Sequence, residues 1–137
     1  ISSKDSSYFS PNNINIELES LENGKSFKLS NVNFETNSYE VNSVVKQILI
    51  EFADYLKLNS GLVIEINGFT DNIGDQIDNK LLSENRARAV REIILSEGID
   101  KDRISYNGFG EQFPIADNSS EKGRAANRRT EFKIIKQ

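Results

Sequence analysis

The 137-residue sequence contains no cysteine and no histidine. Without cysteine there are no disulfides and no thiol chemistry, but the compartment stays open, because many periplasmic domains also lack cysteine. Without histidine the chain lacks the commonest general base and the commonest transition-metal ligand. No apolar run is long enough to span a bilayer, so we expect no membrane insertion of this segment.

The chain also lacks a strong excess of either charge. It has 17 Lys and Arg against 21 Asp and Glu, which gives a formal net charge of −4. Because there is no basic excess, nucleic acid is not an expected partner. The length suits one domain with a single core. A chain that starts Ile1-Ser2-Ser3 is expected to be a fragment of something longer, behind another domain.

The N-terminal part predicts a linker followed by a hairpin. Residues 1–13 are rich in Ser, Asn, Lys and Asp, which is typical of a linker. Alternating apolar residues then predict a strand, Asn23-Gly24 is a strong hairpin-turn signal, and residues 27–34 predict the return strand. The predicted domain therefore spans residues 14–137 and opens with a hairpin over 14–34.

The rest of the chain alternates between helical and strand patterns. The clearest helix covers residues 41–58, where one apolar stripe comprises Val41, Val45, Ile48, Leu49, Phe52 and Leu56. Further patterns predict a helix over 83–97 capped by Ser83, a short helix over 121–127, and strands over 62–66, 103–109 and 130–134. This order predicts an α+β sandwich with helices on one face of a mixed sheet.

Two charged residues stand out in this pattern. Asp71 follows the end of a strand, where ligands bind in α/β sheets, and Arg86 falls in the predicted first turn of the next helix. A cation there opposes the helix dipole at a cost of about 0.3–1 kcal/mol, so an anion should offset it. Asp71 and Arg86 could together hold a small zwitterion beside the helix N–H groups. From charge placement alone, a structural salt bridge between them is favoured, because surface ion pairs are common.

Two blocks of residues follow the same pattern as a known family. The first block is Gly68-x-Thr70-Asp71-x-x-Gly74, followed by Asn79, Leu82-Ser83 and Arg86-Ala87-x-x-Val90. The second block is Gly108-x-Gly110-Glu111-x-x-Pro114, followed by Asn118, Gly123-Arg124 and Asn127-Arg128-Arg129. In order and spacing they resemble the OmpA-like C-terminal domain shared by OmpA-type outer-membrane proteins, the lipoprotein Pal and the flagellar stator protein MotB. The resemblance covers roughly residues 27 to 135.

The resemblance implies a fold and a ligand. The family fold is the α+β sandwich predicted above. Family members bind the stem peptide of peptidoglycan through diaminopimelate, whose far end carries a free amino and carboxyl pair when it is not crosslinked. Carried over to this sequence, Asp71 accepts the ammonium and Arg86 clamps the carboxylate.

The same resemblance adds further candidates to the ligand site. Thr36 and Asn37 correspond to a loop that forms one wall of the pocket, although an Asn after a strand is more often only a turn residue. The backbone N–H of Ser83 is a candidate donor. Arg128 belongs to a pair of arginines of which one approaches the ligand. From the residues alone, Arg124, Arg128 and Arg129 could form an anion site or structural ion pairs, and structural pairs are favoured.

The loop between Gly68 and Asn79 is expected to be braced from within. Thr70 and Asn79 are the predicted bracing residues and are included among the ligand-site candidates. Phe69 and Asp78 depart from the commonest family pattern: Phe69 is a conservative aromatic change expected to pack under the loop, whereas Asp78 replaces an apolar side chain with a charge near the pocket. The acidic residues of this loop lack the order of an EF-hand, so no metal and no other cofactor is expected.

These observations predict a non-catalytic module that binds peptidoglycan and anchors an envelope protein to the cell wall. Its expected location is the periplasm of a Gram-negative bacterium, associated with the outer membrane. One alternative is a protein–protein interaction domain of an envelope complex that has lost wall binding. The other is a cell-wall hydrolase, which the missing histidine and cysteine and the lack of a nucleophile elbow and a phosphate loop disfavour.

Overall fold

The computed structural model describes residues 8–9, 16–17 and 22–137. Its centre is a four-stranded sheet in the order β3-β6-β4-β5. The strands are β3 (Ser26–Lys28), β4 (Val63–Phe69), β5 (Ile104–Gly110) and β6 (Arg129–Lys136). β4 and β5 are parallel, whereas β6 is antiparallel to both β4 and β3. The predicted mixed sheet is therefore confirmed.

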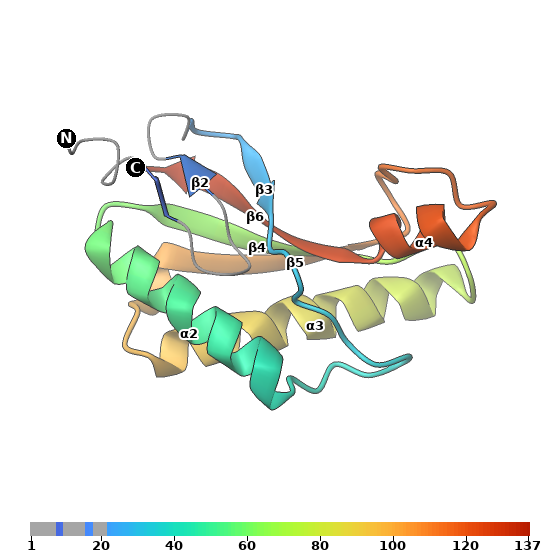
Figure 1. The fold of residues 1–137 in the computed structure, drawn as a ribbon, viewed down its shortest axis with the longest axis horizontal. Coiled ribbons are helices and arrows are strands. Elements are labelled where there is room, and N and C mark those ends of the chain that lie inside the picture. The colour runs from blue at the N-terminus through green and yellow to red at the C-terminus, as the bar shows by residue number, and fades with distance from the viewer. Residues whose placement is uncertain (1–7, 10–15, 18–21) are drawn as a thin grey trace.

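Two long helices, α2 (Ser43–Leu58) and α3 (Gln76–Ser96), cover one face of this sheet (Figure 1). A 3-10 turn, η2 (Lys101–Arg103), precedes β5, and the short helix α4 (Glu121–Asn127) lies at the end of the sheet opposite the C-terminus. α2 begins at Ser43 rather than at the predicted Val41, and the other residues of the predicted stripe are buried, with the Phe52 ring 4.8 Å from that of Phe132. Asn42 caps α2 by accepting a hydrogen bond from the N–H of Val45. The α+β sandwich is thus confirmed.

The N-terminal hairpin differs from the predicted one. β2 (Ile16–Glu17) pairs with β1 (Tyr8–Phe9), and β3 pairs instead with β6. The turn at Asn23-Gly24 does form, with Gly24 at φ +86°, but the strand after it joins the central sheet. The physical reason is the core: Phe27 stacks on Phe132 at 5.4 Å, and an isolated two-stranded hairpin is only marginally stable. The rest of the predicted linker and first hairpin strand lies outside the described residues.

Helix α3 begins earlier than predicted, at Asp75 rather than at Ser83. The Asp75 carboxylate accepts a hydrogen bond from the N–H of Asp78 at 3.0 Å, which makes Asp75 the N-cap. The sequence does not predict this helix start because the apolar residues of the first turns, Ile77 and Leu81, are exposed and do not form a buried stripe. Ser83 lies inside the helix and is fully buried, and its hydroxyl accepts from the N–H of Gly110.

Two glycines let α3 lie directly on the sheet. A Cβ atom on Gly68 would lie 2.5 Å from the Ser83 carbonyl oxygen, and one on Gly108 would lie 2.3 Å from the backbone nitrogen of Glu84. Gly68, inside β4, therefore allows the close approach of the helix to the sheet. This contact fixes the position of α3, and with it the position of Arg86.

Side chains of α3 bond to the backbone of β5, one of the two edge strands of the sheet. Lys80 donates to the Gly108 carbonyl at 2.9 Å, and Arg91 donates to the Ile104 carbonyl at 2.6 Å. These bonds tie α3 to β5. Among the described residues, no helix has the length and apolar character needed to cross a membrane.

Candidate ligand-binding site

A groove of about 820 Å³ opens at the C-terminal end of β4. Its walls come from four segments: residues 32–37, the loop after β4, the first half of α3, and α4 with the start of β6. This is the edge of the sheet where Asp71 was expected to meet a ligand. The groove brings together Thr36, Asn37, Asp71, Asn79, Arg86 and Arg128.

Asp71 is buried at the base of this groove. Its Oδ1 accepts a hydrogen bond from the N–H of Ile73 at 2.9 Å, and its Oδ2 pairs with Nη1 of Arg128 at 2.7 Å. The ion-pair partner of Asp71 is therefore Arg128, and the predicted salt bridge to Arg86 is wrong. α4 and β6 bring Arg128 to Asp71 from far along the chain, which the local spacing of charges does not reveal.

Arg86 lines the same groove but bonds to the loop before α2 and not to Asp71. Its Nε donates to the carbonyl of Ser38 at 2.8 Å and its Nη2 to that of Glu35 at 3.1 Å. The guanidinium also lies over the Phe34 ring, 5.2 Å from the ring centroid. Because α3 begins at Gln76, Arg86 is not in the first helical turn and does not oppose the helix dipole there.

Arg86, Arg128 and Asp71 lie close enough for the charges of Arg128 and Asp71 to affect the pKa of Arg86. Burial lowers the pKa of Arg86 below its usual value, the nearby charge of Arg128 lowers it further, and Asp71 acts in the opposite direction. The guanidinium remains charged at neutral pH, because arginine starts far above it. The groove therefore holds the buried carboxylate of Asp71 close to the guanidinium groups of Arg86 and Arg128.

The loop with Thr36 and Asn37 forms one wall, as predicted. Asn37 adopts a left-handed backbone conformation, with φ +57°, which Asn tolerates better than most residues. The two bonds from Arg86 hold the carbonyls of this loop on either side of that turn. The shape of the wall thus depends on Arg86.

Thr70 and Asn79 brace the loop after β4, as predicted. The Thr70 hydroxyl donates to the Asp71 carbonyl at 2.8 Å, and the Asn79 amide donates to the Ile73 carbonyl at 2.9 Å. Asn79 also lines the groove, whereas Thr70 and Ser83 lie outside it. The prediction that Ser83 offers an exposed helix N-terminal N–H is wrong, because Ser83 lies well inside α3.

Glu121 is a groove residue that sequence reasoning missed. Its Oε2 pairs with Nη2 of Arg128 at 2.6 Å and its Oε1 with Nε of Arg124 at 3.3 Å. The hydrogen bond from Arg128 lowers the pKa of Glu121, and the Glu121 and Asp71 carboxylates together raise that of Arg128. The spacing of Glu121, Arg124 and Arg128 on one helical face was the available signal. Arg128 and Arg124 thus make structural pairs, and Arg129 pairs with Glu131.

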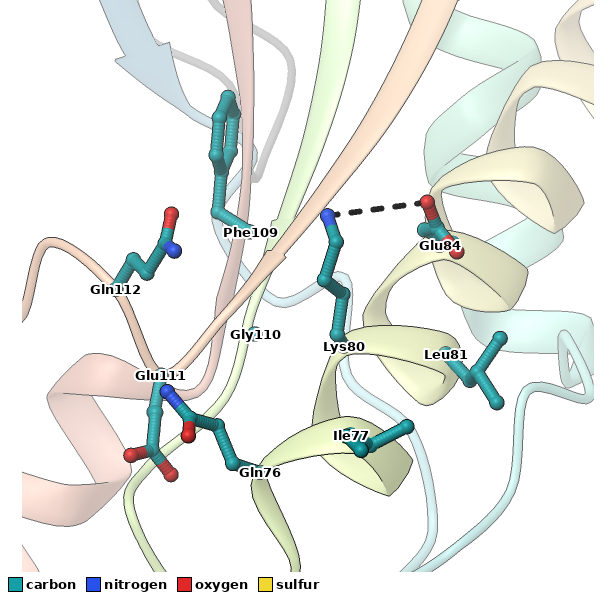
Figure 2. A pocket seen from close by; sticks show the side chains of 9 residues that line it. All are labelled: Gln76, Ile77, Lys80, Leu81, Glu84, Phe109, Gly110, Glu111 and Gln112. Atoms are coloured by element: carbon teal, nitrogen blue, oxygen red, sulfur yellow. Dashed lines mark ion pairs between the residues drawn. The ribbon is translucent and has the colours of Figure 1, made fainter.

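A second cavity, of about 360 Å³, lies between α3 and the end of β5 (Figure 2). Its only cation, Lys80, is paired with Glu84 at 3.9 Å and donates to the Gly108 carbonyl. Ile77, Leu81 and Phe109 supply apolar side chains to its wall, and Glu111 also lines it, so the cavity has no cation left for an incoming carboxylate. The groove at Asp71, and not this cavity, has the chemistry for a zwitterion.

Comparison with known proteins agrees with the fold. Residues 33–128 match the sequence profile of the OmpA family. The chain is 40% identical over 83 residues to outer membrane porin F of Pseudomonas aeruginosa, which covers 60% of this chain and 24% of the relative. It is 40% identical over 88 residues to the peptidoglycan-binding protein ArfA of Mycobacterium tuberculosis, covering 64% of this chain and 27% of ArfA.

A solved structure extends the similarity to three dimensions. The peptidoglycan-associated lipoprotein from Burkholderia pseudomallei superposes with a TM-score of 0.69 at 31% identity, covering 75% of this chain and 87% of that one. The chain spans about a quarter of the length of the porin F relatives it matches. Since the family profile covers most of the sequence and both groove-forming blocks, the chain belongs to the OmpA family.

Proposed function

We propose that this chain binds the stem peptide of peptidoglycan, without catalysis, through the free end of its diaminopimelate residue. The observation that carries the proposal is a groove in which a buried carboxylate, Asp71, faces two arginines, Arg86 and Arg128. The far end of diaminopimelate offers an ammonium and a carboxylate on one carbon, which matches both signs of charge. Relatives named a peptidoglycan-binding protein and a peptidoglycan-associated lipoprotein support the same ligand.

In this proposal the two charged ends of the ligand have separate partners. The ammonium approaches Oδ2 of Asp71, which pairs with Arg128 in the unliganded chain, while Oδ1 keeps the Ile73 N–H. The carboxylate approaches Arg86, which uses Nε and Nη2 for the Ser38 and Glu35 carbonyls and keeps Nη1 for an incoming anion. Arg86 would thus join the ligand to the loop wall that surrounds it.

Each such contact is weak alone. Two charge-assisted contacts of about 2 kcal/mol each correspond to a dissociation constant on the order of 1 mM. Retention on a cell wall would follow from many stem peptides and many protein copies acting together. The proposed role is therefore to tether a longer envelope protein, in the periplasm of a Gram-negative cell. The relatives include an outer membrane porin and a lipoprotein, which favours that location.

Sedimentation with purified diaminopimelate-type wall sacculi tests the proposal. We expect the parent chain to sediment with the sacculi, Asp71→Asn to stay in the supernatant, and the exposed control Asp54→Asn to behave as the parent. Both substitutions remove one negative charge, so only the position differs. The sacculi should release no soluble fragments during the incubation. Equal retention of Asp71→Asn and the parent would overturn the assignment, and released fragments would favour a hydrolase.

A further inference from the structure

Each carboxylate oxygen of Asp71 already has one partner before any ligand arrives. One carboxylate oxygen accepts the Ile73 N–H and the other pairs with Nη1 of Arg128 at 2.7 Å. An ammonium that approaches Oδ2 therefore meets the Arg128 guanidinium at the same atom. Two cations beside one buried carboxylate repel each other, so binding requires Arg128 to find other anions.

The structure provides one such anion in Glu121. The second arm of Arg128, Nη2, pairs with Oε2 of Glu121 at 2.6 Å, so the guanidinium bridges two carboxylates. The Glu121 side chain is 67% exposed, against 12% for Asp71, so it can follow Arg128 away from the groove at little cost. Arg124 pairs with the other oxygen of Glu121 at 3.3 Å and keeps this carboxylate on the same face of α4.

The ligand itself provides the other anion when it is a zwitterion. An ammonium alone displaces Arg128 from Asp71 but brings no anion to replace the partner that Arg128 has lost. An ammonium with a carboxylate on the same carbon brings a new partner into a groove lined by Arg86 and Arg128. The exchange then breaks one opposite-charge contact, Asp71–Arg128, and forms two, whereas an ammonium alone breaks one and forms one.

We propose that Arg128 and Glu121 determine specificity in this groove by partner exchange. Arg128 leaves Asp71 only for a ligand end that carries both an ammonium and a carboxylate, and Glu121 holds Arg128 during the exchange. This inference rests on the proposed function and adds a reason why a diaminopimelate end is preferred to a lysine end, which has the ammonium but no carboxylate. Glu121 is a positioning residue in this scheme.

The test compares two stem tripeptides that differ only in the third residue, diaminopimelate or lysine. Affinities for the 137-residue chain and its variants are measured by backbone amide shifts in ¹⁵N-labelled protein. The parent should prefer the diaminopimelate peptide. Arg128→Gln should strengthen lysine-peptide binding roughly two- to fivefold, the factor that a partly exposed ion pair contributes, and so lower the preference. Glu121→Gln should weaken both peptides, the lysine peptide more, and so raise the preference.

Matched controls remove the same charges elsewhere. Arg88→Gln removes an exposed arginine whose one side-chain bond is to Asn85, and Glu92→Gln removes an exposed carboxylate paired with Arg91. Both should leave the preference unchanged. Arg128→Lys keeps the charge but cannot span two carboxylates, so it should fall between the parent and Arg128→Gln. Thermal unfolding of each variant shows whether the fold is retained.

The outcomes separate this inference from the proposed function. A parent that binds neither peptide would overturn both. A parent that binds the diaminopimelate peptide, with a preference that Arg128→Gln and Glu121→Gln leave unchanged or shift in the same direction, would overturn partner exchange alone. Opposite shifts in the two variants, absent in the two controls, would support it.

Discussion

Replacing Arg86 by lysine should loosen the groove wall even without ligand. The side chain donates to the carbonyls of Ser38 and Glu35 and lies over the Phe34 ring. A lysine ammonium keeps the charge, but it is a single point and cannot reproduce the planar fork that reaches both carbonyls. We therefore expect loss of at least one of the two bonds and of the stacked contact.

The expected loss of stability in Arg86→Lys depends on how far these hydrogen bonds are buried. A hydrogen bond to a charged group contributes about 1.5–3 kcal/mol, and partial exposure of Arg86 lowers this to about 1 kcal/mol per bond. With the contact to Phe34, Arg86→Lys should reduce the free energy of unfolding by about 1–2 kcal/mol. For a domain of this length that corresponds to a decrease in Tm of roughly 3–8 °C.

Urea unfolding and backbone amide spectra of the unliganded chain measure this effect. The control is Arg88→Lys, two positions along the same helix, where the guanidinium is exposed and bonded to the Asn85 side chain. We expect the control to match the parent, and Arg86→Lys to shift the amide signals of residues 34–40. An unchanged unfolding midpoint together with unchanged signals in 34–40 would refute the claim that Arg86 holds the wall.

Three further predictions test the packing, a buried phenol and the charge of the site. Gly108→Ala places a Cβ 2.3 Å from the Glu84 backbone nitrogen and should lower the free energy of unfolding in urea by about 1–3 kcal/mol. The control Gly61→Ala, whose Cβ would lie 3.7 Å from its nearest neighbour, should change the free energy of unfolding by less than about 0.5 kcal/mol. Equal effects of the two substitutions would contradict the close approach of α3. Burial raises the pKa of Tyr55 to about 12 from 10.0, so the folded state holds this proton longer than the unfolded state. Its stabilising contribution is complete below pH 10 and is lost as the pH rises toward 12, with a slope of at most about 1.4 kcal/mol per pH unit; unfolding midpoints of Tyr55→Phe should fall less steeply there, and parallel curves would refute it. Retention on sacculi should decrease as salt is raised to about 0.5 M, because the contacts are charge-assisted and partly exposed, and salt-insensitive retention would indicate an apolar mode.

Local patterns predicted most elements because those elements have one buried face. The stripe of α2 and the alternation of β6 follow directly from burial on one side, and both match the structure. The start of α3 was not predicted because its first turns lie between the groove at Asp71 and the cavity beside β5, and they carry exposed apolar residues. The partner of β3 escaped because Asn23-Gly24 specifies a turn but not which strand lies beside the chain that leaves it.

For the site, the sequence predicted which residues line the groove but not which charged residues pair with one another. The motif residues Asp71 and Arg86 do line one groove, together with Thr36, Asn37, Asn79 and Arg128. Which charges pair is decided by tertiary structure: Arg128 reaches Asp71 from the end of α4, and Arg86 turns to the loop before α2. Charge placement along the chain cannot distinguish these pairings, because the candidates differ only in three-dimensional position.

The most direct test of the central claim is titration of the ¹⁵N-labelled chain with a diaminopimelate stem tripeptide. The account predicts amide shifts at millimolar ligand that cluster at Thr36–Asn37, around Asp71 and at Arg86, and their loss in Asp71→Asn. No shifts at this concentration, or shifts confined to the cavity between α3 and β5, would contradict it.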